Sequence, residues 1–208
     1  MLDAHWLLFT VASLVLIATP GQDMILVMSR SVAQGPRAGV ATAAGVSLGL
    51  IGHTVLATLG LGAILAASEV LFTVLKFVGA AYLIYLAVGL LRSRSAEIVM
   101  DPSRVRSMRR LFADGALSNL SNPKIAVFYF AFLPQFVAPN AARPALTIFA
   151  LGCAFAVLTF AIKGPVGLTA GLLSGWLRAR PRVVVWLYRS SGVVLLLLGI
   201  RLALERRQ

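Results

Sequence analysis

The sequence predicts an all-α integral membrane protein with six transmembrane helices, arranged as two inverted three-helix halves with broken helices in the first and fourth spans. Composition is the first of three observations behind this prediction. Of the 208 residues, 59% are hydrophobic and only 12% are charged, and the mean hydropathy is +0.90. So few charges do not cover the surface of a soluble domain, which points to a lipid environment.

Long windows without charge are the second observation. Residues 38–68 contain no Asp, Glu, Lys or Arg, while 70–91 contain only Lys76 and 144–177 only Lys163. Stretches of roughly 18 or more apolar residues predict membrane spans. The apolar windows predict six, at about 4–31, 38–67, 70–92, 112–138, 144–172 and 183–203. One long polar connection, 93–110, divides this single transmembrane domain into inverted repeats at about 1–92 and 111–204.

The basic residues predict the orientation. They concentrate in three connections, which hold Arg30 and Arg37, the run from Arg92 to Arg110, and Arg178, Arg180, Arg182 and Arg189. The positive-inside rule puts these connections in the cytoplasm and both termini outside. Topology therefore accounts for the net charge of +12. Since no basic stripe carries interleaved aromatic residues, we expect no nucleic-acid partner.

The N-terminal segment and the cysteine count narrow the class further. The first apolar stretch lacks a basic start and a small-residue cleavage site, so we expect a mature span rather than a signal peptide. Cys153 is the single cysteine, which excludes an internal disulfide and a cysteine-based metal cluster.

Two helix-start motifs inside apolar stretches are the third observation. They are Thr19-Pro20-Gly21-Gln22-Asp23 and Asn119-Leu120-Ser121-Asn122-Pro123-Lys124. A capping residue directly before a proline is typical of a helix start. We expect Thr19 to cap the first helix in a capping box with Gln22, and Asn122 to cap the second. Backbone groups freed inside a bilayer need protein or a polar cavity, so two matched breaks predict a transporter binding site.

The residue types at these breaks favour an amphoteric small molecule. Helix N-termini attract a carboxylate, whereas Asp23 and unwound carbonyls attract an ammonium group. Lys124 opposes the helix dipole and is costly to bury, so we predict an Asp23–Lys124 pair at rest, exchanged for substrate or a proton. The predicted substrate or translocation residues are Thr19, Pro20, Gly21, Gln22, Asp23, Asn119, Asn122, Pro123 and Lys124, with His53, Lys163 and Tyr82 as secondary candidates.

Each candidate also has a plainer interpretation. The breaks are alternatively proline kinks that only shape packing, and Asp23 is alternatively a first-turn acid favoured by the dipole. Lys163 either extends to the membrane surface or lines a pathway. His53 either forms an interhelical hydrogen bond or carries a proton, and Tyr82 either packs or lines the site.

Small residues four apart predict close helix contacts. Gly45 and Gly49 form one such set, and Gly167, Gly171 and Gly175 form another. They allow helices to approach either within one chain or between chains of a homo-oligomer.

Three segments resemble the LysE/RhtB family of amino-acid exporters, and the likeness covers essentially the whole chain. They are Ala18 to Met24, the helix from Gly79 to Arg92 with its tyrosines, and Ser118–Lys124 running into residues 128–136. The resemblance implies a secondary transporter, not an enzyme and without a cofactor. It implies efflux of amino acids or their derivatives across a bacterial inner membrane, driven by protons or the membrane potential. The family usually shows Thr-Pro-Gly-Pro, and Gln22 replaces the second proline here.

Two other functions stay open beside amino-acid export by proton antiport. One is a divalent-cation exporter, for which one cysteine, two histidines and one central carboxylate make a poor soft-metal site. The other is a membrane-embedded enzyme, for which the chain lacks a Gly-x-Ser-x-Gly elbow, a His-x-x-x-His pair and paired intramembrane carboxylates. A scaffold without transport leaves the matched breaks unexplained.

Overall fold

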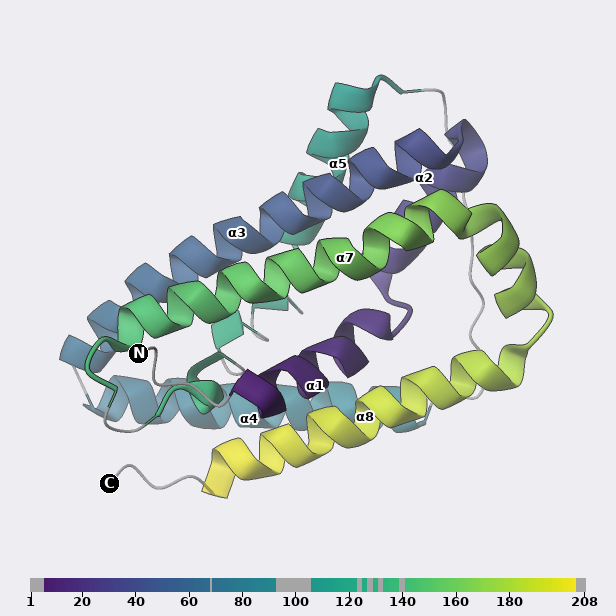
Figure 1. The fold of residues 1–208 in the computed structure, drawn as a ribbon. Coiled ribbons are helices and arrows are strands. Elements are labelled where there is room, and N and C mark those ends of the chain that lie inside the picture. The colour runs from purple at the N-terminus through teal and green to yellow at the C-terminus, as the bar shows by residue number, and fades with distance from the viewer. Residues whose placement is uncertain are drawn as a thin grey trace.

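The regular elements of the computed structural model are helices (Figure 1). It describes residues 6–67, 69–92, 106–122, 125–126, 129–130, 133–138 and 141–204. The helices are α1 (Trp6–Ala18), α2 (Gln22–Gln34), α3 (Pro36–Ala67), α4 (Glu69–Leu91), α5 (Met108–Leu120), the 3-10 turn η1 (Leu133–Phe136), α7 (Pro144–Arg178) and α8 (Pro181–Leu204). The all-helical prediction is confirmed for these residues.

Local chemistry explains several helix ends. Pro36, Pro144 and Pro181 each open a long helix, where the missing N–H removes no intrahelical bond. Gly35 ends α2 with φ 92°, a value that favours glycine, and its N–H donates to the Ser31 carbonyl at 2.8 Å. The helix at the predicted fourth span begins a few residues before the approximate start expected at 112. The helix begins at Met108 because the Ser107 hydroxyl accepts the Arg110 N–H at 3.4 Å.

The apolar helices support a membrane protein. Within the described residues, Pro36–Gly60 and Pro144–Ala170 are each long and apolar enough to cross a bilayer. Helices α1 and α2 qualify together as a third candidate, bent by 52° at the residues between them. This bend confirms the break in the first predicted span.

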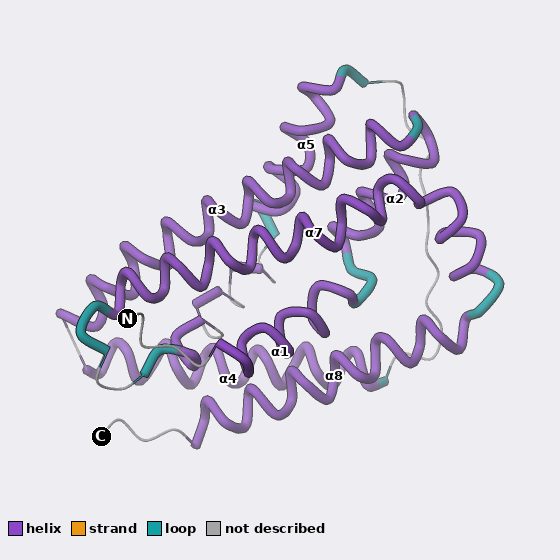
Figure 2. Tube along the Cα trace, viewed as in Figure 1, coloured by secondary structure: helices purple, strands orange, loops and turns teal. Residues whose placement is uncertain are grey.

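Helices α3 and α7 lie side by side along most of their length (Figures 1 and 2). They run antiparallel, since Gly39 meets Gly167 at one end and Thr54 meets Gly152 further along. A Cβ on Gly167 would lie 2.7 Å from the Gly39 backbone, so the two helices touch through their main chains.

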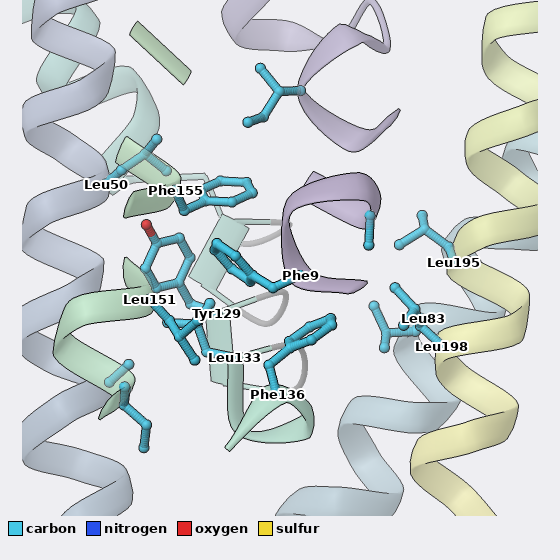
Figure 3. Close-up of a cluster of buried hydrophobic side chains, with 14 of the residues drawn as sticks. Phe9, Leu50, Leu83, Tyr129, Leu133, Phe136, Leu151, Phe155, Leu195 and Leu198 are labelled. Atoms are coloured by element: carbon cyan, nitrogen blue, oxygen red, sulfur yellow. The ribbon is translucent and has the colours of Figure 1, made fainter. Parts of the chain in front are cut away.

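Helices α4 and α8 form a second pair, and α1 lies between the two pairs (Figure 1). Large side chains around α1 make one buried cluster (Figure 3). Phe9 of α1 packs edge-on against Phe136 of η1, with ring centroids 5.4 Å apart. Leu83 of α4 and Leu198 of α8 close the cluster from the other side. The cluster fixes α1 in place and leaves its C-terminal end beside the break.

Helix α5 contacts α3 through glycines. Gly45 and Gly49 of α3 face the α5 backbone, and a Cβ on Gly49 would lie 2.8 Å from the Ala116 carbonyl oxygen. Gly115 of α5 faces the Thr42 carbonyl in turn. The predicted close approach of Gly45 and Gly49 therefore occurs within one chain, and it brings the end of α5 to the first break.

Asp114 of α5 holds a cluster of arginines at the far end of α2. Its carboxylate pairs with Arg106, lies 3.9 Å from the Arg30 guanidinium and is also 3.9 Å from Arg110. Gln34 at the end of α2 donates to the Arg106 carbonyl at 2.9 Å and accepts the Arg106 N–H at 3.0 Å. The end of α2 is therefore joined to α5 and the residues before it by ion pairs and by hydrogen bonds from the Gln34 side chain to the Arg106 backbone.

We expect the D114N variant to unfold at lower temperature. The substitution would remove the carboxylate charge that faces the largely buried Arg30, and we expect a loss of about 1–3 kcal/mol. Thermal unfolding of the solubilised protein measures this loss. The R110Q variant is the control, because that side chain is 71% exposed and should contribute little. Equal unfolding temperatures for both variants would contradict the structural role of Asp114.

Candidate functional site

The first break lies between Ala18 and Gln22, but its capping differs from the prediction. Gly21, in an extended conformation with φ −133°, is the residue before α2, and no side chain caps that helix. The Thr19 hydroxyl instead donates to the Val15 carbonyl at 2.9 Å and contacts the Ser191 hydroxyl of α8. The predicted capping box was wrong because threonine can bond back to its own preceding turn. Thr19 therefore ends α1.

The residues after Gly21 reach across to α5. The Gln22 amide donates to the Ser118 hydroxyl at 3.5 Å instead of capping its own helix. Pro20 is buried within the break, and it follows the last turn of α1. The break is thus held by contacts to α5 and α8 rather than by a local cap.

A second interruption follows α5. Leu120 ends the helix, and the Asn122 carbonyl accepts the N–H groups of Ile125 and Ala126 at 3.0 and 3.1 Å. A helical turn therefore begins after Asn122, as the motif predicts. Pro123 and Lys124 lie outside the described residues, so their roles and the Asp23–Lys124 pair stay predictions.

Asp23 forms a buried ion pair with Lys163 of α7. The Lys163 Nζ lies 3.2 Å from Asp23 Oδ2, and the two side chains are only 9% and 6% exposed. The Asn119 amide donates to the same oxygen at 2.8 Å. A charge pair this deep is costly unless both partners are held in place, and such groups within a membrane are often functional. Lys163 therefore points inward, and does not extend to the surface.

His53 of α3 contacts Asn119, the residue that binds Asp23. Its Nε2 lies 3.1 Å from the Asn119 carbonyl oxygen, which is an acceptor only, so this nitrogen carries the hydrogen. The imidazole thus binds the last turn of α5 and fixes the residue that holds Asp23. Tyr82 lies elsewhere, on α4, half-buried beside Tyr85 with ring centroids 6.2 Å apart. The structure does not bring Tyr82 to the break.

One pocket is lined by half of the predicted site residues. Its empty space is about 730 Å³, a volume that includes the open mouth. The predicted residues that line it are Thr19, Gly21, Gln22, Asp23, Asn122 and Lys163. Its apolar wall comes from five helices, α1, α3, α4, α7 and α8, and includes Leu16, Leu50, Leu86, Leu90, Phe155 and Leu195. The two breaks and Lys163, far apart in the sequence, thus share a single cavity.

Two residues that line the pocket carry polar atoms with no partner in the described part of the chain. Asp23 Oδ1 and the Thr159 hydroxyl are both buried without a hydrogen bond. Buried polar atoms normally have partners, so such atoms in a cavity indicate a place for a ligand or water. Asp23 Oδ2 is bound by Asn119 and Lys163, whereas Oδ1 remains available to a ligand.

Two polar residues that line the pocket were not predicted from the sequence, Thr159 and Ser191. Thr159 lies one helical turn before Lys163, so its spacing on the same helix face is a usable signal. Ser191 next to Gly192 gives a weaker one, because small polar pairs in apolar helices are often packing contacts.

The chain matches one protein-family model, described as LysE type translocator, over residues 14–206. It is 32% identical to a homoserine/homoserine lactone efflux protein of Salmonella typhimurium, covering 97% of each chain. It is 26% identical to a leucine efflux protein of Klebsiella pneumoniae, covering 96% of this chain and 94% of the relative. An uncharacterized membrane protein of Pseudomonas aeruginosa is 32% identical, over 90% and 89%. No solved structure matches.

Proposed function

Because the chain belongs to the LysE type translocator family, we propose that it exports amino acids or amino-acid derivatives across the bacterial inner membrane, by proton antiport and alternating access. The efflux relatives support this substrate class. The family membership also favours a translocator over an enzyme. The two efflux relatives differ in substrate, so the individual amino acid is left to experiment.

The buried carboxylate of Asp23 at the first break carries this proposal. Asp23 lines the pocket and its Oδ1 has no partner among the described residues, so the carboxylate suits the ammonium group of an amino acid. The unpaired N–H groups at the start of α2 are next to it and favour negative charge. A proton or an ammonium can each neutralise the carboxylate, so we propose that the two compete for it during antiport.

Six spans in two inverted halves remain our proposal for the topology. An inverted repeat makes α3 equivalent to α7 and α4 to α8, with one break in the first span of each half. The antiparallel α3–α7 and α4–α8 pairs support this arrangement. So do the break before α2 and the interruption after α5. The same topology puts both termini outside and 93–110 in the cytoplasm.

The position of the pocket favours an inward-facing conformation. On α4, which runs toward the cytoplasmic connection, Leu86 and Leu90 line the pocket and lie beyond the core residue Leu83. On α8, which leaves the cytoplasmic side, Ser191 of the pocket comes before the core residue Leu198. We therefore propose that the part of the cluster around Phe9, Phe136 and Leu198 closes the outer side while the pocket faces inward (Figure 3).

Transport by purified protein in lipid vesicles tests the proposal. Labelled amino acids, including leucine, threonine, homoserine and lysine, are offered with an imposed pH gradient. We expect uptake of at least one amino acid that stops when the gradient is collapsed at a fixed electrical potential. Movement of divalent cations with no amino-acid transport would instead favour the cation exporter. Crosslinking in the same vesicles tests the predicted homo-oligomer.

A further inference from the structure

Lys163 supplies the positive charge among the described residues that line the pocket. Its ammonium makes one hydrogen bond in the described part of the chain, to Asp23 Oδ2 at 3.2 Å. An ammonium group has three donors, and a buried one needs an anion close by. Two of its donors thus remain for another acceptor in the pocket.

Asp23 changes partners more easily than Lys163 does. The Asn119 amide holds Asp23 Oδ2 at 2.8 Å, and Oδ1 has no partner among the described residues. A substrate ammonium at Oδ1 therefore satisfies this carboxylate while Asn119 keeps it in position. The negative charge that offset Lys163 is then shared with the substrate, and Lys163 needs a second anion.

The charge balance of the pocket identifies that anion. Asp23 and Lys163 together make the described lining neutral. A zwitterion keeps every charge paired, because its ammonium faces Asp23 and its carboxylate faces Lys163. A derivative with an amide or ester in place of the carboxylate brings only a positive charge, and it leaves two cations around one anion in a poorly hydrated site.

We propose that Lys163 binds the α-carboxylate of the substrate and makes the site select free amino acids over derivatives whose carboxylate is blocked. This inference rests on the proposed amino-acid export and assigns Lys163 the specificity-determining role within it. The side chain is already held at the correct depth in the pocket by Asp23, so little movement is needed for the exchange.

Matched acids and amides test this role. Binding of leucine and leucinamide, and of threonine and threoninamide, is measured on the solubilised protein, so that membrane permeation of the amides has no effect. Each amide keeps the side chain and the ammonium and loses only the carboxylate. We expect the wild type to prefer the acid by at least ~10-fold, which is the size of one charge-assisted hydrogen bond.

Variants at position 163 separate this role from a structural one. K163M removes the charge at similar length, so we expect the acid preference to disappear and the amide to bind at least as well as the acid. K163R keeps the charge and should keep the preference for the acid. A purely structural lysine would lower the affinity for acid and amide by the same factor in K163M, leaving their ratio unchanged.

The outcomes distinguish the inference from the function on which it rests. If no amino acid is transported in vesicles, the proposed function fails. If an amino acid is transported but its acid and amide bind equally to the wild type, only the inference fails. The wild-type ratio decides even where K163M does not accumulate as folded protein.

Discussion

The D23N variant is expected to lose transport by at least ~100-fold. The substitution removes the carboxylate's charge-assisted contact with Lys163 and its contact with the substrate ammonium together. Asparagine keeps the size of the side chain and an oxygen for the Asn119 amide, but it has no charge for a substrate ammonium or a proton. Initial rates of amino-acid uptake into vesicles measure the loss. Wild-type rates in D23N would remove Asp23 from the mechanism.

The double variant D23N/K163M separates folding from transport. D23N alone leaves Lys163 as a buried cation without its carboxylate, which costs about 3–5 kcal/mol. Replacing both charges relieves that cost, because neutral substitutes for a buried pair are often tolerated. We expect the double variant to regain thermal stability and to remain inactive. Recovery of transport along with stability would show that the pair has only a structural role.

The G45L variant is expected to prevent folding. A side chain at Gly45 would collide with the Phe112 carbonyl of α5, which is backbone and has no rotamer to adopt. Separating α3 from α5 also moves Asn119 away from Asp23. We expect destabilisation of at least about 3 kcal/mol, at the upper end for overpacked sites. The yield of monodisperse solubilised protein and its thermal unfolding measure the effect.

Gly89 offers the matched control for this substitution. It lies in α4, and a Cβ built there meets nothing within 4 Å. The G89L variant makes the same chemical change at an open position, so we expect it to accumulate and unfold like the wild type. Equal behaviour of G45L and G89L would contradict the close contact between α3 and α5.

The apolar pattern predicted the helices well because it depends on local sequence alone. The windows at 38–67, 144–172 and 183–203 correspond to α3, α7 and α8 within a few residues at most ends. The end of α7 was missed by more, since the helix continues past 172 to Arg178. Proline at a helix start is a strong local signal, and Pro36, Pro144 and Pro181 each occupy one.

The partners within the site were harder to predict because they depend on packing. Asp23 was identified from its place after the first break, and its contact with Asn119 joins the two motifs as expected. Its contact with Lys163 depends on the level at which α7 passes α2, where the Ser31 hydroxyl donates to the Gly167 carbonyl. No spacing in the sequence encodes that level. The Thr19 cap failed for a different reason, since a threonine before a proline can end one helix as well as begin another.

The order in which the chain is made gives the Asp23–Lys163 pair a consequence during membrane insertion. The two residues are 140 positions apart, and Asn119 is 96 positions from Asp23. The translocating machinery therefore receives the carboxylate long before the ribosome has produced either group that satisfies it. Until α5 and then α7 emerge, the first span carries an uncompensated acid, which hydrocarbon disfavours. We therefore expect α2 to remain at the aqueous boundary in nascent chains that stop before α7. The helix should enter the bilayer only after Lys163 has been synthesised.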